Sequence, residues 1–351
     1  MNGRLTVNNI RLDRRALSRG LVVTTVVLVM VASGSGWFRW FDTALAGYLF
    51  GVLFLVFATV YRYSVWLTRP PTAKLHQRGW EALWQRGERS TNVRSLPALI
   101  VKNLLLQTFV WRRSRTRWAA HQLIFWGCML AVAVTFPLTF GWFHFKSVGQ
   151  SARTYETFVT TVPVLQFDIG GVLAWLFFHA LDISAVLVLA GVFVFLLRRL
   201  KEPGAVATER SNDFLALAGL FAVSITGLML TVSHQFMEGK FYSFLNVLHA
   251  LTVVLGLAYI PFGKLFHIFQ RPANLGVTFY KQAASDGAPQ TCLECGQPFA
   301  SELQVADLQA ILPDLGFDYD IAGGGNWQQV CQSCRRRLVA RSQSVRVGGF
   351  G

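Results

Sequence analysis

Two histidines, His249 and His267, lie eighteen residues apart in one apolar segment in which Lys264 is the only charged residue between them. Eighteen residues make five helical turns at about 3.6 residues per turn, so both imidazoles would leave the same face, about 27 Å apart at a rise of about 1.5 Å per residue. That distance is close to the thickness of a bilayer's hydrocarbon core, where ionisable side chains are rare and usually functional. The spacing predicts a helix that holds two stacked haems and carries electrons across or along a membrane.

Four cysteines near the C-terminal end form two CxxC pairs, Cys292 with Cys295 and Cys331 with Cys334, and 35 residues separate the pairs. Four thiolates from two tight turns suit a tetrahedral metal. Zinc is predicted in preference to rubredoxin-type iron, because arginines rather than a glycine follow the second pair; an iron–sulfur cluster is a further alternative. The fifth cysteine, Cys128, stands in an apolar run and is expected to be a packing residue.

The composition predicts an all-α integral membrane protein. Of 351 residues, 53% are hydrophobic and only 15% are charged, and the mean hydropathy is +0.40. A soluble protein of this length carries more charge. The six expected spans cover residues 17–34, 44–66, 119–143, 172–198, 213–233 and 243–268.

The net charge of +15 follows the expected membrane topology. Twenty-nine of the 33 Lys and Arg residues fall in the segments that would share one side of the membrane, and the other four are Arg39, Lys146, Arg153 and Lys240. This alternation obeys the positive-inside rule and predicts a multi-pass protein of a bacterial-type inner membrane with both termini in the cytoplasm. The basic surplus therefore does not indicate nucleic-acid binding. A secretory signal is the alternative to a first spanning helix, and it leaves the remaining topology unchanged.

The chain divides into four expected regions. Residues 1–66 hold two spans, residues 67–118 form a basic cytoplasmic loop, residues 119–271 form a four-helix core, and residues 272–351 form a polar cytoplasmic tail with the four cysteines. Within the loop, residues 96–110 are expected to form a helix in the membrane interface. Docking of a soluble partner on this helix is a compatible alternative.

The charge pattern also assigns a depth to each histidine. His121 begins the third span and His267 ends the sixth, so both lie near the cytoplasmic side and form the best bis-histidine haem pair. His249 lies toward the outer side, at the expected depth of His179. The candidates for the second ligand of His249 are, in order of preference, His179, His144 and His234. His76 and His234 are otherwise expected to be exposed or hydrogen-bonded.

Three segments of this chain resemble a known family. Ala120–Gly127 (AHQLIFWG) is similar to the first haem helix of the respiratory nitrate reductase gamma-subunit-like cytochromes b. His249–Pro272, with Ile260-Pro-Phe-Gly before the second histidine, is similar to the closing helix of that superfamily, and Asp213–Met229 resembles the helix before it. The superfamily includes the membrane subunits of sulfite-reduction-associated and heterodisulfide-reductase-like complexes. The resemblance covers residues 97–272.

The resemblance implies two b-type haems, quinone or quinol as substrate, and a cytoplasmic partner that bears iron–sulfur clusters. It identifies His121 and His267 as one ligand pair and His249 as half of the other. The family pattern has a second histidine ten residues after the first, where this chain has Ala131. The outer haem therefore takes another ligand, such as His179, or is absent.

Quinone chemistry needs a group that accepts or donates a proton at the membrane edge. The candidates are His144, Asp168 and His234 on the outer side, the first two in the loop 144–171, and Lys264 on the inner side. No complete site for converting a substrate is visible, so the chain is expected to be an electron-transfer subunit. The alternatives are a non-redox membrane anchor whose zinc-ribbon tail recruits a cytoplasmic partner, and a proton-coupled transporter.

Overall fold

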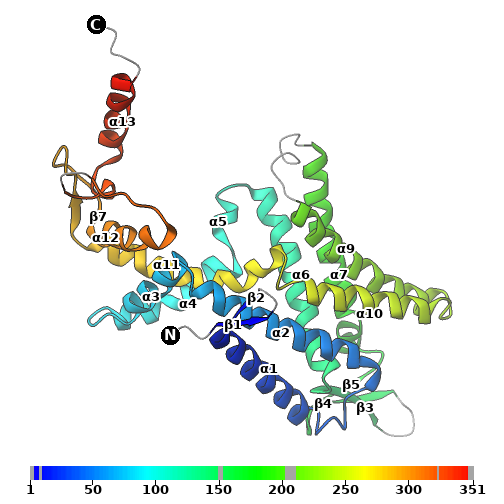
Figure 1. Cartoon of the computed structure of the whole chain (residues 1–351). Coiled ribbons are helices and arrows are strands. Elements are labelled where there is room, and N and C mark those ends of the chain that lie inside the picture. Colours follow the sequence, from blue (N-terminus) through cyan, green and yellow to red (C-terminus); the bar gives the residue numbers. More distant parts are fainter. Residues whose placement is uncertain (1–3, 8–9, 149–152, 202–210, 322–323, 347–351) are drawn as a thin grey trace. The chain divides into compact units, whose positions relative to one another are not determined.

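Six helices in the described part of the chain are long and apolar enough to cross a membrane. The computed structural model describes residues 4–7, 10–148, 153–201, 211–321 and 324–346. The six helices are α1 (Arg14–Gly34), α2 (Ala46–Leu67, preceded by a short 3-10 turn, η1, Thr43–Leu45), α6 (Arg115–Thr139), α7 (Val172–Lys201), α9 (Ser211–Phe236) and α10 (Tyr242–Tyr259) (Figure 1). The six predicted spans are thus present as helices, which suggest a multi-pass membrane protein.

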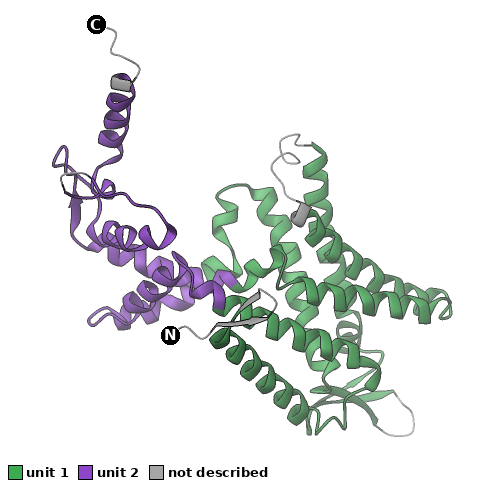
Figure 2. Ribbon diagram, in the orientation of Figure 1, with its two compact units in different colours: residues 1–64, 101–269 green, residues 65–100, 270–351 purple. Residues whose placement is uncertain are grey.

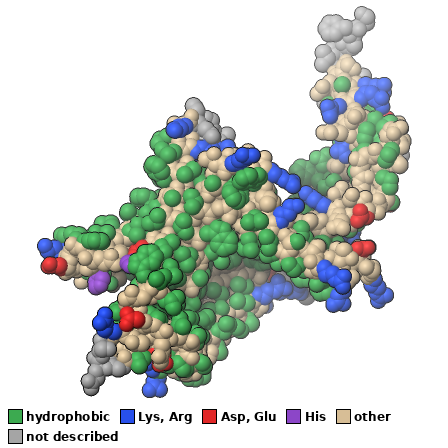
Figure 3. Space-filling model, turned by 180° about the vertical axis from the view of Figure 1, so that it is seen from behind, with side chains coloured by type: hydrophobic (Ala, Val, Ile, Leu, Met, Phe, Trp, Pro, Cys, Tyr) green, Lys and Arg blue, Asp and Glu red, His purple; other side chains and the backbone are tan. Residues whose placement is uncertain are grey.

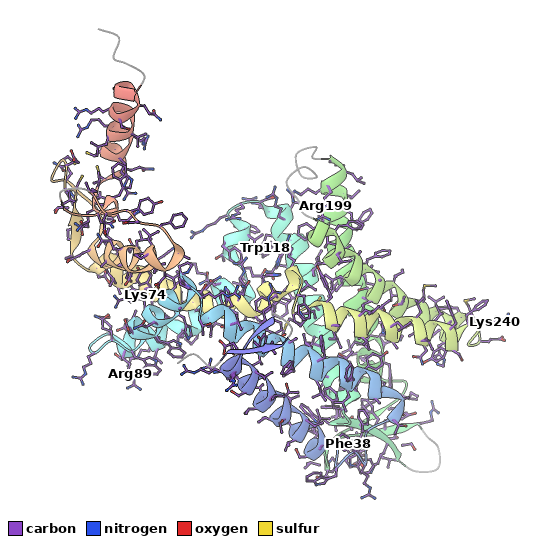
Figure 4. The ribbon with its side chains drawn as sticks, in the orientation of Figure 1. Phe38, Lys74, Arg89, Trp118, Arg199 and Lys240 are labelled. Carbon is purple, nitrogen blue, oxygen red and sulfur yellow. The ribbon has the colours of Figure 1, made fainter. Side chains whose placement is uncertain are left out.

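The surface of these helices is hydrophobic, as contact with lipid requires. Large apolar side chains such as Leu255 and Phe193 are 66% and 60% exposed. Hydrophobic side chains cover most of the visible face of the helical part in Figure 3. Arg199 and Lys240, both labelled in Figure 4, mark the two ends of the α7–α9–α10 group: Arg199 is in the last turn of α7 and Lys240 is in the turn after α9.

Helices α6 and α7 approach each other closely because small residues face each other at their crossing. A Cβ atom on Gly127 would lie 2.7 Å from Val188 Cγ2, and one on Gly191 would lie 2.7 Å from the carbonyl oxygen of Ala120. The hydroxyl of Ser184 donates a hydrogen bond to the carbonyl of Gly127 at 2.8 Å. The crossing therefore holds the His121 end of α6 against α7.

Replacing Gly191 by Val is expected to push α6 away from α7 and to cost about 1–3 kcal/mol, the usual penalty for overpacking. Gly219→Val is the matched control, because nothing lies within 4 Å of a Cβ atom at Gly219 on α9. Thermal unfolding of the detergent-solubilised variants measures the difference. Equal melting temperatures for the two variants would contradict the close approach.

The loop between α6 and α7 forms a sheet, which corrects the expectation of an all-α chain. Its strands, β3 (Phe143–Val148), β4 (Thr154–Val159) and β5 (Val162–Asp168), are antiparallel in that order. The threonines and valines of this loop favour strands, since β-branched residues fit a pleated surface. Two hairpins add β1 (Arg4–Val7) with β2 (Ile10–Asp13), and β6 (Pro289–Thr291) with β7 (Pro298–Ser301).

The sixth predicted span is interrupted between His249 and His267, so the expectation of one continuous helix was wrong. Helix α10 ends at Tyr259, a 3-10 turn, η3 (Lys264–Phe266), follows, and His267 begins a new helix, α11 (His267–Asp286). Pro261 has no N–H and its ring clashes with the preceding turn, so the helix cannot continue. The five-turn geometry that placed both histidines on one face therefore does not apply.

The expected interface helix over residues 96–110 is also divided. It contains the end of α4 (Arg89–Ile100), a π-turn, η2 (Val101–Leu105), and the short α5 (Thr108–Trp111). The backbone reverses at Gln107, whose φ of 49° is left-handed. The carbonyl groups left open at this break accept hydrogen bonds from α6: Trp118 donates to Leu106 at 2.6 Å and Gln122 donates to Leu105 at 3.2 Å.

The chain forms two compact units, each built from segments that are separate in the sequence (Figure 2). Unit 1 contains residues 1–64 and 101–269. Unit 2 joins residues 65–100, which hold α3 (Thr72–Leu83) and α4, with residues 270–351. The C-terminal part of unit 2 contains most of α11, the hairpin β6–β7, α12 (Glu302–Ile311), the 3-10 turns η4 (Pro313–Leu315) and η5 (Trp327–Gln329), and α13 (Gln332–Arg346).

A buried carboxylate, Asp307 of α12, links the separate segments of unit 2. Its oxygens accept hydrogen bonds from Arg78 of α3 at 2.8–3.0 Å, and Lys74 Nζ lies 3.5 Å away. The hydroxyl of Tyr280 on α11 also hydrogen-bonds Asp307. Beside this cluster, a Cβ atom on Gly79 would lie 2.9 Å from the backbone of Gly276, so α3 and α11 touch through their main chains.

Asp307→Asn is expected to destabilise unit 2 by about 2–4 kcal/mol, because the partly buried Arg78 loses its buried counter-charge and keeps only the exposed Glu81. Burial tends to raise the pKa of Asp307, but hydrogen bonds from Arg78 outweigh it and the pKa is lowered. The stabilisation is therefore complete above the unfolded pKa of about 4 and is lost as the pH falls through the folded value. Hydrogen exchange of α3 and α12 between pH 3 and pH 7 measures it, and an unchanged pH profile in Asp307→Asn would contradict it.

Candidate functional site

The imidazoles of His121 and His267 face each other in unit 1. Their ring centres are 6.4 Å apart and their planes are inclined by 73°. His121 lies in the second turn of α6, which begins where Ser114 caps the helix by accepting a hydrogen bond from the N–H of Arg117. His267 is the first residue of α11. The pairing of these two residues agrees with the depth expected from the charge pattern.

The break before His267 is held by α2. Arg62 donates a hydrogen bond to the carbonyl of Pro261, and its guanidinium lies 4.3 Å from the ring centre of Phe266. The ring of Tyr259 covers Gly263, where any side chain would clash. These contacts stabilise the short segment that presents His267. Neither Arg62 nor Tyr259 was predicted from the sequence, because their partners are created by the break.

The geometry of this pair fits an iron atom between the two rings. A metal–imidazole bond is about 2 Å long, and a ring nitrogen lies about 1 Å from its ring centre, so two axial imidazoles of one haem have centres about 6 Å apart. His267 Nδ1 donates to the carbonyl of Lys264 at 2.7 Å. That bond leaves Nε2 as the unprotonated nitrogen, which is the arrangement that metal-binding histidines adopt.

His249 is held against α9 by a hydroxyl. Thr226 donates to the carbonyl of Ala222 at 2.7 Å, so its oxygen accepts from Nδ1 of His249 at 3.0 Å. Gly227 makes room for the ring, since a Cβ atom there would lie 3.3 Å from Cε1. Because Nδ1 contacts Thr226, Nε2 is the ring nitrogen of His249 that is available to a metal. Among the described residues, no second histidine ring is in contact with it.

His179 makes a different contact from the one expected. Its Nδ1 lies 2.9 Å from Asp182, whose other carboxylate oxygen accepts from Thr231 of α9 at 2.7 Å. At about 1.5 Å per residue, Thr231 lies about 7 Å along α9 from Thr226, and His179 lies one further turn beyond Asp182. His249 therefore contacts α9 at Thr226, whereas Asp182, the partner of His179, contacts α9 at Thr231.

The cluster of His179, Asp182 and Thr231 includes functional candidates that the sequence reasoning missed. Asp182 is an acidic residue within the membrane-spanning helix α7, and such residues are costly unless they serve a purpose. The position of Asp182 in an apolar run of the sequence indicates a functional role, but the prediction considered only histidines within this span. Thr226 and Thr231 carried no comparable signal, because threonine is common in membrane helices.

The weaker candidates have ordinary surroundings. His144 is stacked between Trp40 and Phe158, with ring centres 4.7 and 5.2 Å away, and burial lowers its pKa. Asp168 accepts a hydrogen bond from the N–H of Gly170 at 2.8 Å, which stabilises a turn. The other three contact nearby groups: His234 lies near Tyr242, His76 near Trp80, and the carbonyl of Lys264 accepts from His267.

The four cysteines of unit 2 come together as predicted. Their sulfur atoms all lie within 4.8 Å of one another, so they could hold a metal ion. The first pair follows β6 in a tight turn in which Gly296 has a φ of 69° and donates to the carbonyl of Cys292 at 2.9 Å. The second pair lies at the start of α13. Val330, which is only 1% exposed, packs between the two turns with Phe299, Ile321 and Leu338.

Hydrogen bonds from N–H groups reach two of the four sulfur atoms, and the pKa values of Cys292 and Cys334 shift in opposite directions. The N–H of Cys331 donates to Sγ of Cys292 at 3.2 Å, and Arg337 donates to Sγ of Cys334 at 3.4 Å. Burial tends to raise the pKa of Cys292, but backbone hydrogen bonds lower it to about 6. Burial and the neighbouring thiols raise the pKa of Cys334 to about 12. Four ionised sulfurs so close together require a bound cation.

Comparison of the chain with protein-family models, with curated proteins and with solved structures found no match.

Proposed function

We propose that this protein is the membrane cytochrome b subunit of a respiratory-type oxidoreductase, in which His121 and His267 bind a b-type haem. The observation that carries the proposal is the 6.4 Å separation of the two imidazole centres, on helices brought together from distant parts of the sequence. Transfer of one electron at a time is the chemistry that haem supplies when bound. The resemblance to the nitrate reductase gamma-subunit-like cytochromes b supports the same function.

The chain's own residues set the haem ligands in place. The carbonyl of Lys264 fixes the ring of His267, and the α6–α7 crossing positions His121. The arginines around positions 112–117 and 198–199 would lie on the cytoplasmic side, where the proposed iron–sulfur partner docks. His249 is the proposed ligand of a second haem and, like His267, would bind it through Nε2. The other axial ligand of that haem, for which the candidates are His179, His144 and His234, stays a prediction.

The proposed substrate is quinol, oxidised to quinone with release of two electrons and two protons. A proton acceptor inside the membrane is needed for this reaction. His179 and Asp182 are the proposed proton acceptor. The carboxylate of Asp182 lies 2.9 Å from the imidazole of His179 and accepts a hydrogen bond from Thr231 at 2.7 Å. Both residues lie toward the Lys240 end of the bundle. The carboxylate and imidazole would accept protons while electrons move toward the His121–His267 pair.

The experiment is a reduced-minus-oxidised absorbance spectrum of the purified protein, followed by anaerobic addition of a menaquinol or ubiquinol analogue. A b-type α-band that develops with dithionite and again with quinol is the expected result. Without an α-band the haem proposal is wrong. An α-band that only dithionite develops would retain the haem and reject the quinol.

A second candidate, a non-redox membrane anchor, is favoured by the cysteine cluster. Zinc held by four cysteines has no redox role and builds a small domain that suits protein contacts. We propose zinc at this cluster in both cases. The two candidates differ in haem content, so the same spectrum separates them.

A further inference from the structure

Helix α3 has two opposite faces of different character. One face is docked within unit 2: Gly79 meets the backbone of Gly276, Ala82 is buried, and Arg78 binds Asp307. The opposite face carries three aromatic residues spaced by four, His76, Trp80 and Trp84, with ring centres 6.2 and 6.4 Å apart in succession. Residues spaced by four follow one side of a helix.

The aromatic face is open. Trp80 and Trp84 are 50% and 46% exposed, and the two indoles are parallel. Arg89, at the start of α4, lies 4.5 Å from the ring centre of Trp84 (Arg89 is labelled in Figure 4). Two neighbouring exposed tryptophans are unusual on a water-facing helix, because each leaves a large apolar ring in solvent.

The bilayer interface is the partner that this face fits. Tryptophan prefers the headgroup region, where its ring is partly apolar and its N–H finds a partner. Helix α3 begins only five residues after the membrane helix α2 ends, at Thr72 and Leu67 respectively, so the chain delivers it to the membrane surface. Four exposed arginines precede or follow α3 in the sequence, and their positive charge would attract anionic lipid headgroups. They are Arg69, Arg86, Arg89 and Arg94.

We propose that α3 lies in the membrane interface through His76, Trp80 and Trp84 and that its opposite face holds the cysteine-cluster domain there. In this arrangement Arg78 and Lys74 bind Asp307 on one side while the tryptophans bind phospholipid headgroups on the other. The metal-binding domain is therefore held at the membrane surface rather than extending freely into the aqueous phase. This goes beyond the proposed electron transfer and does not depend on haem.

The test is backbone hydrogen exchange of the full chain in nanodiscs of phosphatidylcholine and phosphatidylglycerol, compared with detergent micelles. Exchange of residues 72–84 is expected to be about tenfold slower in the nanodiscs. The double variant Trp80→Gln with Trp84→Gln should lose that difference. The matched control is Leu315→Gln with Val339→Gln, which removes two exposed apolar side chains of the same unit and should retain it.

A second measurement identifies what the face touches. With p-benzoylphenylalanine in place of Trp84, illumination in nanodiscs should attach phospholipid to the chain, whereas the same substitution of Val339 should not. Lipid adducts at both positions, adducts at neither, or exchange that is equal in nanodiscs and detergent would overturn the proposal. Cross-linking from position 84 to a second copy of the chain would assign the face to self-association instead.

Discussion

Replacing His267 by Ala is expected to remove the haem held by His121 and with it at least half of the b-type absorbance. The centres of the two rings are 6.4 Å apart. A single remaining axial imidazole binds b-type haem much more weakly, and the vacant position alters the spectrum from that of a six-coordinate centre. The measurement is haem per chain by the pyridine haemochrome method, together with the reduced α-band.

The matched control for this prediction is His76→Ala. His76 lies on α3, outside the spans, with Trp80 as its ring contact, and its removal should leave haem content unchanged. His121→Ala should reproduce the loss seen with His267→Ala, and the double variant should lose no more than either. An unchanged spectrum in His267→Ala would reject this residue as a ligand. A loss confined to His249→Ala would assign the haem to His249, in the middle of α10.

The sequence was sufficient to predict the six apolar spans, the proximity of His121 to His267 and the cluster of four cysteines. Span positions follow from the length of apolar runs, which the bilayer dictates. The pairing of His121 with His267 followed from matching charge at the two helix ends, and the cysteine cluster followed from local spacing. The charge at the helix ends and the spacing of the cysteines can both be interpreted without knowing how the helices pack.

The failures arose where packing or a local break decided the outcome. Pro261 was part of the family resemblance, and it ends the helix between His249 and His267. The predicted distance and common face of the two histidines nevertheless assumed one continuous helix. The hydrogen bonds of Asp182 with His179 and Thr231 were not predicted either, because the contact with Thr231 depends on how α7 and α9 pack.

The composition of unit 2 was beyond sequence reasoning for a similar reason. The ion pair of Arg78 with Asp307 joins residues 229 positions apart. Neither residue is unusual in its own segment, since a basic loop and a polar tail both contain many charges. Only burial of the carboxylate, which is 5% exposed, distinguishes this pair from a solvated one.

Removing the metal from the cysteine cluster is expected to unfold the C-terminal part of unit 2 while the six spans remain intact. The apolar core around the cluster is small: its fully buried members are Cys292, Val330 and Cys334. A core of this size cannot offset the conformational entropy of the segment from β6 to α13. Binding of structural zinc contributes about 10–16 kcal/mol in comparable sites, which exceeds the whole stability of many small domains.

Cys334→Ser tests this without a chelator. Zinc content should fall from one atom per chain to almost none. Trypsin should cut after Arg335–Arg337 at least about a hundredfold faster, because it cleaves the unfolded form and loss of the metal increases the population of that form. Cys128→Ser is the control, since that thiol lies in α6 and outside the cluster. Loss of the fold should also release Arg78 from Asp307, so hydrogen exchange in α3 should rise with that in α12. A Cys334→Ser protein with full protection of α12 would show that the ion pair, rather than the metal, holds this domain together.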